Sequence, residues 1–164
     1  MGMSRRDEAI LRLMLETGAR AGEIAALERD DIDAAAGTAI IRRGKGGKGH
    51  IIPFGPHAAL ALDRYMRLRT HHRLADSPAL WLGDRGKTFS YDALHKALGE
   101  RANAAGVVGY HPHLMRHTAA HRSWPTKSWS GVKKSRVLMT PKLRRRSTVT
   151  GRAGRFLCRV LLGR

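Results

Sequence analysis

The architecture of this chain can be worked out from the stretch Glu16-Thr17-Gly18-Ala19-Arg20-Ala21-Gly22-Glu23-Ile24. Upstream of it, a capping signal at Ser4 is followed by apolar residues at helical spacing, and Gly18 is a typical helix terminator. Downstream, residues 21–27 show the apolar spacing of a second, short helix. Arg20 therefore lies at the junction between two predicted helices.

After a polar turn over residues 30–33, the sequence predicts a small β-sheet. Isoleucine-rich runs over 38–43 and 50–54 have strand character, and the linker 44–49 contains four glycines in six residues, which permits a tight hairpin. A further short strand is expected over 80–82. We therefore expect a hairpin or a three-stranded antiparallel sheet.

The rest of this region has helical signals. Pro56 suits the first turn of a helix that runs to about Thr70, and Ser90 is a typical cap for another helix that ends near Gly106. A last helix is expected to begin around His113. The residues expected to face inward from the helix after Pro56 are Leu60, Ala61, Tyr65 and Leu68. The predicted fold class is mainly α with a small antiparallel β-sheet (α+β).

The charge of the chain is distributed unevenly. The 164 residues include 31 Lys and Arg against 13 Asp and Glu, a net charge of +18. All 13 acidic residues lie within residues 1–121 together with 18 basic ones, so this part carries +5 and residues 122–164 carry +13. We expect a globular domain over 1–121 followed by a basic, disordered tail. Such basicity predicts attraction to polyanions, and nucleic acid is the first candidate.

Other features of the composition exclude several protein classes. The single cysteine, Cys158, excludes an internal disulfide and a multi-cysteine zinc site. No apolar run approaches the ~20 residues of a membrane helix, and the N-terminus lacks the apolar core of a signal peptide. We therefore expect a cytoplasmic protein with no membrane partner.

Three separated basic motifs are candidates for chemistry. They are Arg20 in the stretch quoted above, Lys45 in Arg43-Gly-Lys45-Gly-Gly-Lys48, and the cluster His111-Pro-His113-Leu-Met-Arg116-His117-Thr118. Each alone has an ordinary interpretation as a surface arginine, a soluble hairpin tip or one exposed helix face. In this order they closely resemble the catalytic domain of the tyrosine recombinases, the phage-integrase family, over about residues 5–122. The resemblance implies the family's DNA breaking-rejoining fold, with 1–121 a partial catalytic domain.

The resemblance also implies site-specific DNA recombination or integration, by strand breakage and rejoining through a phosphotyrosine intermediate. Arg20 and Arg116 would clamp the phosphate, because arginine stays ionised and presents a planar fork to two oxygens. Lys45 would protonate the leaving 5′-oxygen, and His113 would assist the nucleophile or hydrogen-bond the phosphate.

Additional contacts with DNA are expected from Arg43, Lys48 and His117. Glu23 could orient Arg20, although an ordinary role on the helix surface is an equal alternative. The resemblance implies no metal and no other cofactor. The expected partner is double-stranded DNA, on which the chain would form a homo-oligomer.

The sequence departs from the family pattern after Arg116. The family's Gly-His or Gly-Trp pair and its nucleophilic tyrosine have no match in residues 117–164, because Tyr65, Tyr91 and Tyr110 all precede Arg116. We therefore expect a chain that binds DNA but does not cleave it by itself. A reading-frame change or truncation is our hypothesis for the origin of the tail, and a genuine fusion is the alternative.

Two rival interpretations concern other kinds of site. A non-catalytic basic nucleic-acid-binding protein would use the tail as a polycation and contact phosphates without sequence choice. The spacing of His113, His117 and His121 on one helix face suggests a metal, but no nearby carboxylate or cysteine completes the set. We therefore expect no metal site.

Overall fold

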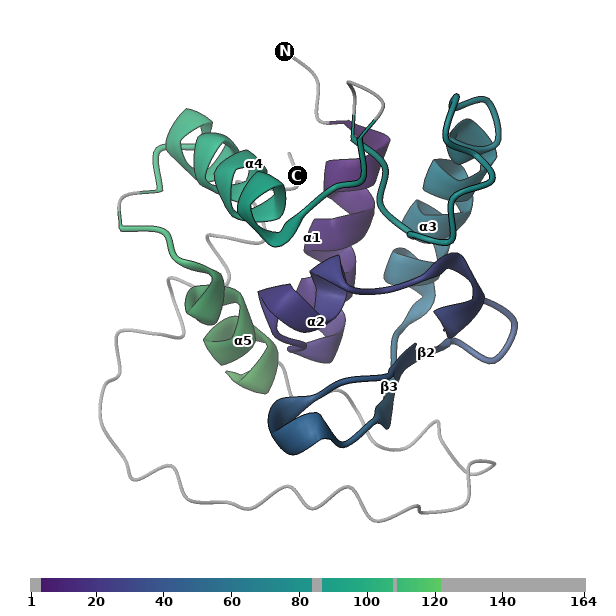
Figure 1. Cartoon of the computed structure of the whole chain (residues 1–164). Coiled ribbons are helices and arrows are strands. Elements are labelled where there is room, and N and C mark those ends of the chain that lie inside the picture. Colours follow the sequence, from purple (N-terminus) through teal and green to yellow (C-terminus); the bar gives the residue numbers. More distant parts are fainter. Residues whose placement is uncertain (1–3, 84–86, 108, 122–164) are drawn as a thin grey trace.

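The computed structural model describes residues 4–83, 87–107 and 109–121 (Figure 1). The predicted basic tail over 122–164 lies outside the described residues. In the described part of the chain, no helix is both long and apolar enough to cross a membrane. The elements follow one another in the order α1 (Arg5–Thr17), α2 (Ala21–Ala25), η1 (Arg29–Asp31), β1 (Ile32–Asp33), β2 (Thr38–Ile41), η2 (Lys45–Gly47), β3 (His50–Pro53), α3 (Pro56–Arg69), α4 (Tyr91–Ala104) and α5 (Pro112–His121), where η marks a 3-10 turn. This is the mainly helical fold with a small antiparallel sheet that the sequence predicts.

Helix α1 lies at the centre of the fold and has the predicted ends. The Ser4 hydroxyl accepts a hydrogen bond from the Asp7 N–H at 3.2 Å. At the other end, Gly18 adopts a left-handed conformation with φ of +65°, and its N–H donates to the Met14 carbonyl at 2.9 Å. Helix α1 packs against α3 and α5 and also contacts α2 and α4 (Figure 1). Its buried apolar residues are Ala9, Ile10, Leu11, Leu13, Met14 and Leu15.

The three strands form one antiparallel sheet in the order β1-β2-β3. Part of the stretch 30–33, predicted as a turn, forms strand β1 in the structure, where Ile32 pairs with Ala39. The linker between β2 and β3 spans residues 42–49 and contains η2, so it is wider than the tight hairpin expected. The glycines of this linker therefore form a broad loop rather than a two-residue turn.

Helix α3 faces the core with a different stripe from the one predicted. Ala61 and Tyr65 are buried as expected, but Leu60 is 50% exposed and Leu68 is 57% exposed. Successive helical residues turn by about 100°, so Leu60 points away from the buried stripe and Leu68 lies at its edge. Arg69 occupies the centre of the stripe in the last turn and is buried. Its guanidinium donates to the backbone carbonyls of Ala75, Ser77, Ala79 and Leu80.

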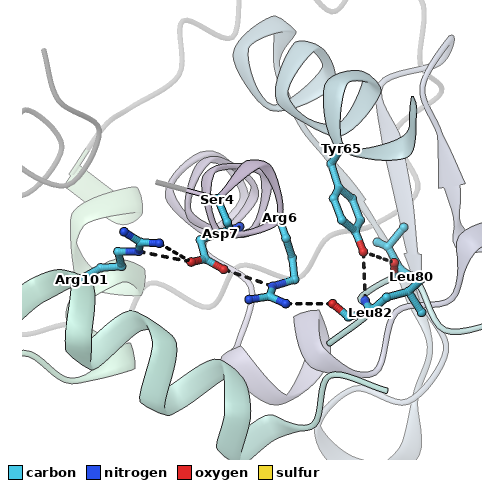
Figure 2. Close-up of polar contacts among 7 residues, drawn as sticks. All are labelled: Ser4, Arg6, Asp7, Tyr65, Leu80, Leu82 and Arg101. Atoms are coloured by element: carbon cyan, nitrogen blue, oxygen red, sulfur yellow. Dashed lines mark hydrogen bonds and ion pairs between the residues drawn. The ribbon is translucent and has the colours of Figure 1, made fainter. Parts of the chain in front are cut away.

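Residues 80–82 are buried but do not form the predicted strand. Isolated β-bridges lie at both ends of the segment instead. The Trp81 indole N–H donates to a backbone carbonyl of α2 at 2.6 Å. The Tyr65 hydroxyl donates to the Leu80 carbonyl and accepts from the Leu82 N–H, each at 2.9 Å (Figure 2). Side-chain hydrogen bonds, together with backbone hydrogen bonds from Leu80 N–H to the Leu27 carbonyl and from Phe89 N–H to the Trp81 carbonyl, hold the segment in place of a strand ladder.

A buried ion network joins the start of α1 to α4 (Figure 2). The Asp7 carboxylate accepts from Arg101 Nη2 at 3.1 Å and from Arg6 Nε at 3.1 Å. Arg6 Nη1 donates to the Leu82 carbonyl at 2.9 Å, and its guanidinium carbon lies 4.1 Å from the centre of the Phe89 ring. Because Arg6 and Asp7 are both buried, each charge depends on the other for its stability.

We expect Gly18→Ala to lower the free energy of unfolding by about 2 kcal/mol. An alanine in the left-handed region costs about 1–2 kcal/mol, and its methyl group would lie 3.1 Å from Ala119 Cβ. Gly99→Ala is the matched control, since a methyl group there meets nothing within 4 Å among the described residues. In the interior of α4 it should stabilise the protein by about 0.5–1 kcal/mol. Urea unfolding followed by circular dichroism measures both, and equal shifts would contradict the special role of Gly18.

Candidate functional site

A pocket of about 350 Å³ opens where α2, the β2–β3 linker, the start of α4 and α5 meet. Its charged side chains among the described residues are three arginines, Arg20, Arg43 and Arg116, and one carboxylate, Glu23. The remaining lining residues are Ala19, Ala21, Gly22, Gly44, Tyr91 and Pro112. The surplus of positive charge makes this pocket a candidate site for an anion.

The position of Arg20 is set by Glu23. Arg20 precedes α2 in an extended conformation, and its backbone N–H donates to Glu23 Oε2 at 2.8 Å. The Arg20 guanidinium Nη1 donates to the other carboxylate oxygen, also at 2.8 Å. Glu23 is buried, whereas 40% of the Arg20 side chain is exposed. Of the two interpretations of Glu23, this geometry supports the one in which it orients Arg20.

Arg116 reaches the same pocket from α5. Its Nη1 donates to the Gly18 carbonyl at 3.2 Å, so the arginine is tied to the end of α1. Met115, the residue before it, is fully buried and anchors α5 in the core. The exposed Arg116 side chain therefore stands on a helix whose position is set by the core. The structure thus brings together two arginines that are far apart in the sequence.

The adjacent residues Arg42 and Arg43 have different environments. Arg42 Nε donates to Asp31 Oδ1 at 2.6 Å, and Arg42 Nη1 pairs with Glu28 at 2.9 Å. Hydrogen bonding to Asp31, together with its negative charge, raises the pKa of the Arg42 guanidinium above its usual value. Arg42 thus ties the base of the β2–β3 linker to η1, whereas Arg43 lines the pocket and has no ion pair with another described residue.

The other predicted site residues are placed by their backbone. Lys45 begins η2 directly after the pocket residue Gly44, and Lys48 is exposed in the same linker. His113 and His117 both belong to α5. The side chains of Lys45, His113 and His117 lie outside the described residues, so their roles stay predictions. The described part of the chain contains no group of three His, Cys, Asp or Glu residues that could hold a metal. The side chain of His121 lies outside the described residues.

The pocket also contains a residue that sequence reasoning missed, Tyr91. The ring lies at the pocket wall and the residue is 48% exposed. The predicted cap at Ser90 correctly places Tyr91 at the first position of α4, since the Ser90 hydroxyl accepts from the Ala93 N–H. No local signal in the sequence shows that this helix start lies beside Arg20.

The comparisons with known proteins agree with this architecture. The model of the Phage integrase family matches residues 2–123. The chain belongs to the phage integrase family. It is 37% identical over 122 residues to the tyrosine recombinase XerD of Mycobacterium tuberculosis, a match that covers 72% of this chain and 39% of XerD. The chain therefore spans about two fifths of the length of this curated relative.

Solved structures of integrase-family proteins share the fold. The crystal structure of XerA recombinase is 29% identical, with a TM-score of 0.65, and the match covers 71% of this chain and 42% of XerA. XerH site-specific recombinase, in a post-cleavage complex with a palindromic difH substrate, has a TM-score of 0.60 at 23% identity. That match covers 73% of this chain and 36% of XerH. The described residues therefore have the fold of the corresponding part of these recombinases.

The three tyrosines of this integrase-family chain have distinct environments. Tyr65 is buried, and both hydrogen-bonding functions of its hydroxyl are used. The Tyr110 hydroxyl is also buried, but it has no hydrogen-bond partner among the described residues. Burial raises the pKa of the Tyr110 hydroxyl well above its usual value. Tyr91 is the tyrosine that lines the pocket.

We expect Tyr110→Phe to stabilise the protein by up to about 1 kcal/mol at pH 7, because it removes a buried hydroxyl without a partner. Since burial raises the pKa of Tyr110 in the folded state, ionisation in the unfolded state destabilises the native protein as the pH rises above about 10. The variant should lose this part of its alkaline sensitivity. Tyr65→Phe is the matched control and should destabilise by about 1–3 kcal/mol. Unfolding curves at pH 7 and pH 10.5 test both variants. If both substitutions change the free energy of unfolding at pH 7 in the same direction, the assignment is contradicted.

Proposed function

We propose that this chain binds double-stranded DNA and that the pocket receives a backbone phosphate between Arg20 and Arg116. The observation that carries this proposal is the convergence of these two arginines, from the start of α2 and from α5, on one pocket wall. An arginine fork matches the oxygens of a phosphate and stays charged at every physiological pH. Because Glu23 fixes Arg20 and the Gly18 carbonyl fixes Arg116, both donors are oriented before the phosphate arrives.

The proposed chemistry is the DNA strand exchange of the family, in which a tyrosine attacks the phosphodiester and a phosphotyrosine links protein and DNA. In this scheme Lys45 protonates the leaving 5′-oxygen, and His113 assists the nucleophile or binds the phosphate. Neighbouring phosphates would contact Arg43, Lys48 and His117. No metal is required, because the arginines supply the fixed positive charge that stabilises the transition state.

A solved structure supports the DNA substrate that we propose. The fold neighbour XerH was captured with a palindromic difH substrate after cleavage. By analogy, this chain would bind the DNA of a recombination site, and we propose that it does so as a homo-oligomer in the cytoplasm. The surplus of guanidinium groups in the pocket supports a DNA partner independently of this analogy.

We further propose that the 164-residue chain binds DNA without cleaving it. Residues 117–164 contain no tyrosine, and of the three earlier ones Tyr65 and Tyr110 have buried hydroxyl groups. The alternative function, a basic protein that binds nucleic acid through its tail alone, draws on the charge of +13 over residues 122–164, where 13 basic and no acidic residues lie. The two functions differ in whether the pocket arginines contribute to binding.

Arg20→Ala and Arg116→Ala should each weaken binding to a duplex oligonucleotide roughly tenfold, the loss expected for one charge-assisted hydrogen bond. Each should also lower the salt dependence of binding by about one phosphate contact. Arg64→Ala is the matched control, because Arg64 is exposed on α3 and lines no part of the pocket. Fluorescence anisotropy at several salt concentrations, on variants whose thermal unfolding matches the parent, measures the effect. Parental affinity in all three variants would favour binding through the tail, and equal losses in all three would indicate diffuse attraction of DNA to the basic surface; either result would overturn the proposed site.

On nicked suicide duplexes, which trap a covalent intermediate when the cut end diffuses away, we expect no protein–DNA adduct from the purified chain. An active tyrosine recombinase on its own suicide substrate is the positive control. Denaturing gel electrophoresis detects the adduct directly. Formation of an adduct by this chain would show that it carries a working nucleophile.

A further inference from the structure

Tyr91 presents an exposed aromatic ring at the wall of an otherwise cationic pocket. Gly22 lies beside the ring, since a Cβ atom built there would be 4.0 Å from Tyr91 Cδ2, and the ring centre lies 6.2 Å from that of His95. The Ser90 cap fixes the helix start from which the side chain projects. The helix start therefore places Tyr91 at the pocket, where the residue is 48% exposed.

The hydroxyl group of Tyr91 is unused within the described part of the chain. No hydrogen bond of this hydroxyl to another described residue is present, whereas the Tyr65 hydroxyl both donates and accepts. Among the described residues, the charged side chains that share the pocket with Tyr91 are three arginines, which offer only donors, and Glu23, whose two oxygens accept from Arg20. Tyr91 is 48% exposed, so water satisfies its hydroxyl in the free protein, and a ligand oxygen in the pocket would replace that water.

We propose that Tyr91 is a further DNA contact of this site, and that its hydroxyl donates a hydrogen bond to a phosphate oxygen of the strand bound by Arg20 and Arg116. This inference rests on the proposed function, because it assumes that the anion in the pocket is a DNA phosphate. In this contact the neutral phenol only donates a hydrogen bond and keeps its proton, so no base is required. The contact adds a directional donor from α4, whereas the guanidinium donors come from α2 and α5.

An uncharged donor has a signature that separates it from the arginines. Removing an arginine lowers both the affinity and the salt dependence, because fewer counterions are released when DNA binds. Removing a phenol hydroxyl lowers the affinity by one neutral hydrogen bond and leaves the number of neutralised phosphates unchanged. A general loss of folded protein would instead lower the fraction of protein able to bind DNA, which does not produce this pattern of affinity and salt dependence.

The test is DNA binding by the full chain carrying Tyr91→Phe, measured by fluorescence anisotropy with a duplex oligonucleotide across a salt series. We expect Tyr91→Phe to weaken binding about 3- to 10-fold with an unchanged salt slope. Tyr110→Phe is the matched control, since it makes the same chemical change at a buried tyrosine that does not line the pocket, and should leave affinity unchanged.

Each other outcome overturns the inference in a defined way. Parental affinity for Tyr91→Phe together with weak binding by Tyr91→Ala would assign the contact to the ring and not to the hydroxyl. Parental affinity for both variants would remove Tyr91 from the DNA site altogether. A covalent adduct on suicide duplexes that Tyr91→Phe abolishes would make Tyr91 a nucleophile. If Arg20→Ala and Arg116→Ala also bind like the parent, the proposed function itself fails. If these two variants lose affinity and Tyr91→Phe does not, only the role of Tyr91 is overturned.

Discussion

The site depends on the left-handed backbone of Gly18. With φ of +65° this residue ends the central helix α1, turns the chain towards Arg20 and directs its carbonyl to the Arg116 guanidinium. The absence of a side chain also lets α5 approach, since a Cβ atom at Gly18 would lie 3.1 Å from the Ala119 methyl. One backbone conformation, which glycine adopts without a steric penalty, therefore brings Arg20 and Arg116 to the same end of α1.

The opposite end of α1 is held by polar contacts with distant segments. The Asp7 carboxylate lies between Arg6 and Arg101, and Arg6 continues the network to the Leu82 carbonyl. Arg69 similarly ties the end of α3 to the segment that leads to residue 80. Removal of Asp7 would take away the carboxylate that both Arg6 and Arg101 contact, which makes this network expensive to break and specific in geometry. They orient α3 and α4 around α1 and so set where the start of α4 meets the pocket.

The parts of this structure that sequence reasoning predicted correctly are those that depend on neighbours in the chain. Ser4, Gly18 and Ser90 act through hydrogen bonds or backbone angles within a few residues, so the ends of their helices could be read from composition. Strand β1 and the irregular segment at 80–82 depend on pairing with distant residues, which local patterns do not encode. The exposure of Leu68 has the same origin, because buried Arg69 takes the inward position through carbonyls beyond the helix. In the site, motif order indicated Arg20 and Arg116, but only the packing of α4 on α2 reveals Tyr91.

Charge placement separates this pocket from the bulk basicity of the chain. Arg42 and Arg43 are adjacent, yet Asp31 and Glu28 neutralise the first and leave the second to the pocket. Glu23 pairs with Arg20, but the pocket keeps a surplus of positive charge because Arg43 and Arg116 also line it. The pocket-lining residues in the described part of the chain all precede the end of α5. The family resemblance implies that the nucleophile would come from a later segment. On this proposal, phosphate binding and strand cleavage would use separable stretches of chain.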